Sequence, residues 1–301
     1  MSQLKMSRRA ALAGVAATPL LSMSAQAQAP MLGANLPEFR RVKLGEFEVT
    51  TLLAGSAVRD EMQTIFGMNV SAEEFQEASD AAGIPSDKAR FYFTPTVVNT
   101  GSALILFDTG LNAAGTTAAL EAAGYSTDQI THVVITHSHG DHIGGLMNEG
   151  AETFGNASYV IGAVEFDNSS GDRFDQMVKP LAEKFSMINP GDAVTSGVEA
   201  MDAFGHTPGH MAYLLDSGGQ QLLIAADFAN HYVWSLAYPD WEVRFDRDKA
   251  AAAATRKRLL GMLAAEKMPF IGYHMPFPAV GYVANRGGSF AYEPMSYQLS
   301  L

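Results

Sequence analysis

The sequence contains no cysteine. This absence excludes disulfide bonds, thiolate metal ligands, a cysteine nucleophile and a lipid-modified N-terminal cysteine. Any metal site in this chain must therefore be built from histidine, aspartate and glutamate. Eight histidines are available among the 301 residues.

Positive charge is also scarce. The chain has 20 Lys and Arg against 32 Asp and Glu, which gives a formal net charge of −12. A surface this acidic disfavours binding to nucleic acid or to anionic lipid through bulk charge. The hydrophobic fraction of 47% and the charged fraction of 17% are typical of a globular protein and exclude a largely disordered chain. We expect a small-molecule substrate and no nucleic-acid partner.

The apolar stretch Ala10–Leu21 is too short to span a bilayer as a mature helix. Basic residues precede it, and A-x-A-like cleavage sites follow it up to Ala29, which is the order of a secretory signal. The pair Arg8-Arg9 resembles a twin-arginine signal, although Ala11 stands where that signal usually has Phe. We predict that residues 1–29 are a cleavable export signal of twin-arginine or Sec type, and that the mature protein is periplasmic or secreted.

Strand-like and helix-like segments alternate through the rest of the chain, with no internal repeat and no long linker. The expected strands are Val42–Leu44, Phe47–Leu53, Phe91–Thr100, Ala103–Phe107, His132–Thr136, Tyr159–Ile161, Val198–Phe204, Ala212–Leu215, Gln221–Ala226, Phe270–Tyr273, Val280–Ala284 and Phe290–Tyr292. The expected helices follow Ser71 to about Ala82 and cover Thr116–Ala123, Asp172–Phe185 and Asp246–Ala265. This pattern predicts a single α/β domain over residues 30–301, with helices outside two packed mixed sheets.

The most informative stretch, residues 136–142 (THSHGDH), directly follows an expected buried strand. Residues two apart in an extended segment point the same way, so His137 and His139 can face one metal ion. Asp141 and His142 lie past the turn and can face a second ion. Imidazole and carboxylate ligands suit zinc, and they also suit iron, manganese or cobalt.

Three further ligand candidates lie at or just beyond the ends of expected strands. They are His210 in the run GHTPGH, Asp227 after the strand Gln221–Ala226, and His274 in Gly272-Tyr-His274. Active-site residues gather at such strand ends in α/β sheets. Two other histidines are expected to have structural roles. His132 would lie in the core, and His206 would brace the GHTPGH loop.

Together, the H-x-H-x-D-H run, the GHTPGH run, the strand-end Asp and the late His resemble the metallo-β-lactamase fold superfamily over most of the mature chain. The resemblance implies an αββα sandwich that holds two divalent metal ions, with zinc as the first expectation. It implies the following ligands: His137, His139 and His210 for the first ion, Asp141, His142 and His274 for the second, and Asp227 as a bridge. A hydroxide that bridges the two ions would be the nucleophile, which makes Asp141 and Asp227 catalytic.

The resemblance also assigns a role to Asp108, in the strand-end run Asp108-Thr-Gly. Its carboxylate would lie behind the first-metal histidines and fix a ring by accepting the N–H that faces away from the ion. A plain turn residue at the end of a strand is the alternative for this position.

Two segments narrow the branch of the superfamily. Asp227–His231 and His274–Gly281 are similar to the secreted methyl parathion hydrolase and lactonase branch, which implies hydrolysis of lactones, aryl esters or phosphotriesters. The lack of cysteine excludes β-lactamases with a cysteine ligand, and Asp227 argues against those without a bridging carboxylate. A glyoxalase II-like thioester hydrolase usually has basic residues near the last ligand His, and here none follows before Arg286.

Aromatic residues near the ligand segments suggest an apolar pocket for an uncharged or aromatic substrate. The pocket candidates are Phe228, Asn230, Tyr232, Trp234 and Phe277, although the rings could equally fill core. Asn230 and His231 can each donate a hydrogen bond to an oxyanion. We favour His231 as the catalytic donor, with Asn230 as the alternative.

The other function class is a metal-dependent oxidoreductase of the same fold, either a persulfide dioxygenase or a diiron protein. Flavodiiron relatives replace one early His by Glu, whereas His139 is intact here, and the chain leaves no room for a flavodoxin domain. A metal-binding protein without activity is a third option. The sequence leaves the natural substrate and the oligomeric state open, including a homodimer.

Overall fold

The computed structural model describes residues 31 and 33–296. The predicted export signal, residues 1–29, lies outside the described residues. One compact unit begins at Leu36, and everything below concerns that unit. Within the described part of the chain, no helix combines the length and the apolar character needed to cross a membrane.

Two seven-stranded sheets form the centre of the unit. The first sheet has the order β1-β2-β5-β6-β7-β10-β11. Its strands are β1 (Phe39–Leu44), β2 (Phe47–Leu52), β5 (Thr96–Asn99), β6 (Leu104–Phe107), β7 (His132–Ile135), β10 (Ser158–Gly162) and β11 (Phe185–Ile188). The run from β6 to β11 is parallel, and the β1–β6 part is antiparallel, so the sheet is mixed as expected.

The second sheet follows chain order from β12 to β18. Its strands are β12 (Ala193–Thr195), β13 (Val198–Asp202), β14 (Met211–Ser217), β15 (Gln220–Ala226), β16 (Phe270–Gly272), β17 (Val280–Arg286) and β18 (Ser289–Pro294). The pair β15–β16 is parallel and the other pairs are antiparallel. Two small hairpins stand apart, β3 (Gly55–Asp60) with β4 (Lys88–Phe93), and β8 (Met147–Asn148) with β9 (Ala151–Glu152).

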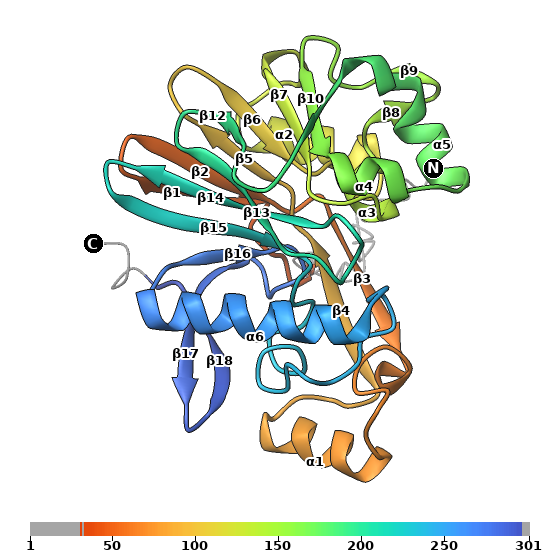
Figure 1. The fold of residues 1–301 in the computed structure, drawn as a ribbon, viewed down its shortest axis with the longest axis vertical. Coiled ribbons are helices and arrows are strands. Elements are labelled where there is room, and N and C mark those ends of the chain that lie inside the picture. The colour runs from red at the N-terminus through yellow and green to blue at the C-terminus, as the bar shows by residue number, and fades with distance from the viewer. Residues whose placement is uncertain (1–30, 32, 297–301) are drawn as a thin grey trace, which may run out of the picture. The chain divides into compact units, whose positions relative to one another are not determined.

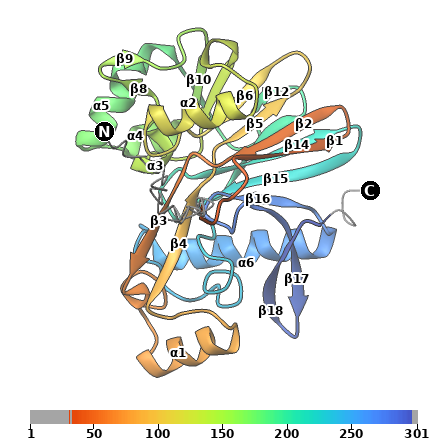
Figure 2. The same cartoon turned by 180° about the vertical axis from the view of Figure 1, so that it is seen from behind.

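Helices cover the outer faces of both sheets (Figures 1 and 2). The α-helices are α1 (Ala72–Ala81), α2 (Ala113–Ala122), α3 (Gly140–Ile143), α4 (Ala163–Asn168), α5 (Asp172–Met177) and α6 (Lys249–Glu266). Three 3-10 helices are η1 (Met62–Thr64), η2 (Thr127–Gln129) and η3 (Lys179–Lys184). Leu120 of α2 belongs to the hydrophobic cluster of the first sheet, and Leu259 of α6 belongs to the cluster that includes Leu223 of the second sheet. The αββα sandwich is confirmed.

Proline residues explain two differences from the expected elements. The expected strand Phe91–Thr100 is two strands, because the chain leaves the β3–β4 hairpin at Thr94-Pro95 and enters the first sheet at Thr96. The expected helix Asp172–Phe185 breaks into α5 and η3, with Pro180 in the first turn of η3. Capping was more predictable, since the Ser71 side chain accepts the Glu74 backbone N–H at the start of α1.

The strand ends place the ligand candidates at one edge of the sandwich. His137 follows β7, Asp227 follows β15, and His274 follows β16. Ala226 has a left-handed backbone (φ 48°) where the β15–β16 register shifts, so the chain turns sharply before Asp227. Such a conformation is strained for alanine and persists where the surrounding packing imposes it.

Candidate metal centre

Four side chains form the first ligand group: His137, His139, His206 and Asp227. Their facing atoms lie within 4.8 Å of one another. Nδ1 of His139 is 3.0 Å from Nε2 of His137 and 3.0 Å from Nε2 of His206. A ring nitrogen carries at most one hydrogen, so hydrogen bonds alone do not account for three nitrogens that face one point. Ligands around one tetrahedral zinc ion lie roughly 3.3 Å apart, close to this spacing.

Asp141, His142 and His274 form the second ligand group. Nε2 of His274 lies 3.4 Å from Oδ2 of Asp141, and Nε2 of His142 lies 3.8 Å from the same oxygen. Asp227 stands between the two groups. Its Oδ2 is 3.5 Å from Nε2 of His206 and 3.1 Å from Nε2 of His274. One carboxylate thus contacts both groups, which is the position a bridging ligand requires.

Two buried atoms at this centre argue that it fits cations. Nε2 of His142 and Oδ1 of Asp227 are 3.5 Å apart, and neither has a hydrogen-bond partner among the described residues. An unpaired buried polar group costs about 1–3 kcal/mol. A divalent cation would satisfy both atoms, and imidazole with carboxylate is a donor set that zinc and related ions accept. The residues therefore fit two metal ions.

Each ring of the two groups except that of His139 is anchored by its second nitrogen. Nδ1 of His206 donates to Oδ1 of Asp246 at 2.9 Å, and Nδ1 of His274 donates to the backbone oxygen of Tyr92 at 2.8 Å. Nδ1 of His137 donates to Oγ1 of Thr136 at 3.1 Å. A proton on Nδ1 leaves the lone pair of Nε2 directed at the centre, which is the tautomer a metal needs.

Asp108 performs the expected kind of task on a different ring. Its Oδ2 accepts Nδ1–H of His142 at 2.9 Å, so it lies behind the second ligand group and not behind the first-metal histidines. The backbone N–H of Thr136 donates to Oδ1 at 2.9 Å and holds the carboxylate in place. Asp108 has φ 60°, a left-handed conformation that Asp tolerates better than most residues.

The geometry corrects the assignment of His210. Its Nδ1 donates to the backbone oxygen of Ala203 at 3.0 Å, and its Nε2 accepts the backbone N–H of Asp227 at 3.1 Å. Both nitrogens are therefore used, and neither lone pair is left for a cation. His206, which the sequence suggested as the brace, faces the centre, while His210 braces the backbone at Asp227.

Glu165 connects the two ligand loops, and sequence reasoning missed it. Its Oε1 accepts the backbone N–H and the hydroxyl of Ser138, and its Oε2 accepts the hydroxyl of Thr207 and the backbone N–H of Gly209. A Cβ at Gly209 would lie 2.1 Å from the backbone nitrogen of Glu165, so this contact requires glycine. Glu165 follows the end of the parallel strand β10, and that position was the available signal.

The local field favours positive charge at the second ligand group. Burial alone would lower the pKa of His142, but the carboxylates of Asp227, Asp108 and Asp141 outweigh it and raise that pKa well above its usual value. Burial opposes ionisation of Asp227, yet His274 and His142 hold its pKa well below the usual value. The carboxylate that contacts both groups is therefore ionised.

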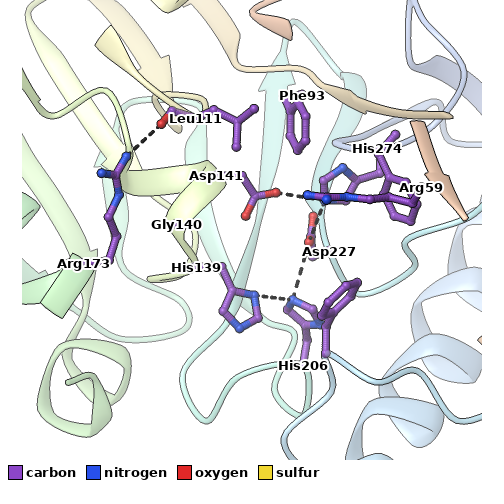
Figure 3. A pocket seen from close by; sticks show the side chains of 12 residues that line it. Arg59, Phe93, Leu111, His139, Gly140, Asp141, Arg173, His206, Asp227 and His274 are labelled. Atoms are coloured by element: carbon purple, nitrogen blue, oxygen red, sulfur yellow. Dashed lines mark hydrogen bonds and ion pairs between the residues drawn. The ribbon is translucent and has the colours of Figure 1, made fainter. Parts of the chain in front are cut away.

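A cavity of about 460 Å³, here called the site cavity, opens onto the centre (Figure 3). Its apolar walls are Phe91, Phe93, Leu111 and Phe245. Two cations also line it. The guanidinium of Arg173 donates to the backbone oxygen of Leu111 at 2.8 Å, whereas Arg59 on β3 is exposed and makes no hydrogen bond or ion pair with the described residues. The metals are thus not the only strong polar anchor that a substrate would meet.

The aromatic residues proposed from sequence do not line this cavity. Phe228 is buried in the hydrophobic core. The indole N–H of Trp234 donates to Oγ of Ser79 at 3.0 Å, which ties that ring to α1. Tyr232 lines a different cavity, and Phe277 is half-buried outside the site cavity. None of these rings lines the site cavity, and Trp234 lines the same cavity as Tyr232.

Asn230 and His231 also have other contacts than expected. Nδ2 of Asn230 donates to Oδ2 of Asp227 at 3.0 Å, so Asn230 orients the carboxylate between the groups. Nδ1 of His231 accepts the backbone N–H groups of Val233 and Trp234. His231 is outside the lining of the site cavity, so the oxyanion role proposed for it has no geometric support.

Comparison with known proteins agrees with this centre. Residues 94–266, more than half of the chain, match the family model of the metallo-β-lactamase superfamily. The uncharacterized protein YobT of Bacillus subtilis is 31% identical over 170 residues, which cover 50% of this chain and 68% of YobT. An N-acyl homoserine lactonase of a Bacillus species is 27% identical over 51% of this chain and 60% of its own length. The solved structure of AidC, described as a dizinc quorum-quenching lactonase, has a TM-score of 0.79 and 27% identity over 86% of this chain and 97% of that chain.

The chain belongs to the metallo-β-lactamase superfamily. Within that superfamily it is a metallo-hydrolase, with a His/Asp centre that suits divalent metal ions.

Proposed function

We propose that this protein is a dinuclear metallo-hydrolase that opens lactones or cleaves aryl esters. The observation that carries the proposal is the position of Asp227 between two ligand groups at the floor of the site cavity. The AidC structure and the Bacillus lactonase support the lactone substrate class. Two bound divalent ions would polarise the scissile carbonyl and lower the pKa of water at the centre to about 7.

The residues of the chain would orient the centre and handle the proton. Asp227 balances positive charge on both sides, and Asn230 holds its Oδ2. Asp141 is the ligand-group carboxylate with the greater exposure, and its side chain points toward His274 (Figure 3). Oδ2 of Asp141 faces His274, so Oδ1 is the atom available to hold a proton and deliver it to the leaving oxygen.

The walls of the site cavity support a substrate with an apolar acyl or aryl part. Phe91 and Phe93 lie on β4, and Phe245 adds a third ring to the lining. A lactone or aryl ester buries its apolar part there while the carbonyl meets the ligand groups. Periplasmic or secreted action, through the export signal at residues 1–29, remains part of the proposal.

The test uses the zinc-loaded protein and measures metal content together with turnover of a γ-lactone, phenyl acetate and a phosphotriester. We expect about two ions per chain and turnover of the lactone, the aryl ester or both, with lower rates on the phosphotriester. Zinc-free protein, prepared with a chelator and restored with Zn²⁺, is the matched control. Two bound ions without turnover of any ester or lactone would reject the proposed hydrolysis.

A thioester hydrolase is the second candidate, and one observation favours it. Arg59 places an unpaired guanidinium at the site cavity, where an anionic tail of a substrate could bind. Turnover of S-lactoylglutathione above that of phenyl acetate, lost in Arg59→Ala, would favour this candidate over a lactonase.

A further inference from the structure

A second cavity, of about 380 Å³, lies on the other side of the β3–β4 hairpin from the site cavity. Side chains alternate along a strand, so the hairpin shows different residues to each cavity. Arg59, Phe91 and Phe93 line the site cavity, whereas Arg90 and Tyr92 line the second cavity. His274 borders both, and its ring donates to the backbone oxygen of Tyr92.

The second cavity has a charge opposite to that of the whole chain. Lys88 and Arg90 line it, and no carboxylate belongs to its described lining. Asp87 lies 3.8 Å from Lys88, but both side chains are largely exposed, so the pair neutralises little. Arg90 donates only to the hydroxyl of Ser56 among the described residues. Two cations without a buried counter-charge, in a chain of net charge −12, favour an anionic ligand.

His231 adds a donor that the protein leaves unused. It is 7% exposed, and its Nδ1 accepts two backbone N–H groups, so the ring proton is on Nε2. Burial lowers the pKa of His231 to about 3, which keeps the ring neutral. Nε2–H has no hydrogen-bond partner among the described residues, and the ring lines the second cavity. This N–H is therefore free to donate to a ligand that enters the second cavity.

The rest of the lining is apolar or aromatic. Ile84, Pro85, Trp234 and Pro276 supply surface without charge. Trp234 stacks on His231 at 4.0 Å between ring centroids, so the donor and the aromatic wall are one rigid unit. An apolar body with one anionic end would match this combination of surfaces.

We propose that the second cavity binds an organic carboxylate with an aromatic or alkyl body, held by Arg90, Lys88 and Nε2–H of His231. The carboxylate accepts from these three donors while the body packs against Trp234 and Tyr92. Binding there adds a ligand-holding function that is separate from the chemistry at the two ligand groups. It does not depend on which ester the protein cleaves.

The experiment titrates the zinc-loaded protein with phenylacetate and follows tryptophan fluorescence, since Trp234 lines the second cavity. Calorimetry gives the same dissociation constant without a fluorescent reporter. We expect saturable binding of phenylacetate. The dissociation constant of the neutral amide phenylacetamide should be higher by about tenfold or more. The double variant Lys88→Ala/Arg90→Ala and the variant His231→Phe should each weaken phenylacetate by about tenfold or more.

Arg59→Ala is the matched control, because it removes a guanidinium from the other face of the same hairpin. We expect it to leave phenylacetate binding within about twofold of the unmodified protein. Circular dichroism and thermal unfolding check that each variant is folded. Three results would overturn the proposal: no saturable binding, equal binding of phenylacetamide, or binding that is lost in Arg59→Ala and kept in the double variant.

Discussion

In each ligand group a carboxylate fixes the ring of one histidine, but the two carboxylates are themselves held by different partners. In the second group, Asp108 fixes the ring of His142 and is itself held by the backbone N–H of Thr136, a neutral donor beside the THSHGDH run. In the first group, Asp246 fixes the ring of His206 and is held by Arg256 on α6, through an ion pair of 2.7 Å. The carboxylate of each pair has the same task, but one rests on a local amide and the other on a distant charge.

This difference decides what a substitution at each carboxylate should cost. Arg256 and Asp246 are both buried, so removing the charge of Asp246 leaves a guanidinium without compensation in the core. Breaking a buried pair in this way costs about 3–5 kcal/mol of stability. Thr136 carries no charge, and when Asp108 is changed, His142 keeps the carboxylates of Asp141 and Asp227 beside it. Substitution of Asp246 should therefore lower the stability of the fold, whereas substitution of Asp108 should mainly weaken metal binding.

The largest effect is expected at Asp227. Because this residue contacts both ligand groups, its substitution should affect both of them at once. Asp227→Asn keeps the shape but places an N–H₂ group opposite rings that should face cations. We expect loss of both ions and a fall in kcat/KM larger than the about 10–100-fold typical of changes behind a ligand. Metal analysis and kinetics on the same preparation measure it. Two retained ions with near-normal kcat/KM would contradict the bridging position.

The next effect separates His206 from His210. His206→Ala should reduce bound metal to about one equivalent and greatly lower turnover, because it removes a nitrogen of the first group. His210→Gln should keep both ions, since an amide oxygen can accept the Asp227 N–H that His210 now accepts. Metal analysis after gel filtration provides the measurement. The reverse pattern, with metal lost in His210→Gln and kept in His206→Ala, would restore the assignment made from sequence.

The confusion between these two histidines shows what a linear motif leaves undetermined. The run GHTPGH contains two histidines four residues apart, and nothing local says which one faces the centre. Asp246, held by Arg256 of α6, anchors the ring of His206. The backbone N–H of Asp227 donates to His210 and keeps that ring away from the centre. Ligands in the THSHGDH run were predictable, since their spacing along one strand end sets their directions.

The cavity walls were less predictable, because they too depend on residues that are distant in sequence. Arg59, Phe93 and Phe245 come from three segments that the fold brings together, and none is near a ligand in sequence. The rings chosen from sequence were near Asp227 along the chain, yet Phe228 is buried in core and Trp234 lines only the second cavity. The sandwich itself followed from alternating strands and helices. Local sequence was enough to predict the ligands. It could not predict the residues that line the cavity around them.

The third prediction tests the two supports directly. Asp108→Asn and Asp246→Asn would each present an amide N–H₂ to Nδ1 of the ring, which moves the ring proton to Nε2, the atom that faces the centre. We expect about 10–100-fold weaker binding of one ion in each variant. Only Asp246→Asn should also lower the free energy of unfolding, by about 3–5 kcal/mol. Metal titrations and denaturant unfolding of zinc-free protein separate the two effects.

A second substitution sharpens that result. In Asp246→Asn/Arg256→Met the unpaired guanidinium is gone, so stability should return while metal binding stays weak. If the double variant instead recovered metal affinity, the ion pair and not the ring tautomer would be the support of the first group. Equal losses of stability in the zinc-free Asp108→Asn and Asp246→Asn proteins would remove the contrast between the groups.

The smallest effect concerns the neighbours Asn230 and His231, and here the structure reverses the order expected from sequence. Asn230 donates to Oδ2 of Asp227, so Asn230→Ala frees the carboxylate that contacts both groups. His231 contacts the backbone of Val233 and Trp234 and lines only the second cavity, so its effect on ester turnover should be smaller. We expect a fall in kcat of up to about tenfold in Asn230→Ala and a smaller fall in His231→Ala. Asn230→Asp is the control that keeps an oxygen but adds charge beside Asp227, and it should be at least as harmful as Asn230→Ala. A larger fall in His231→Ala than in Asn230→Ala, with metal content unchanged, would return His231 to the role of oxyanion donor.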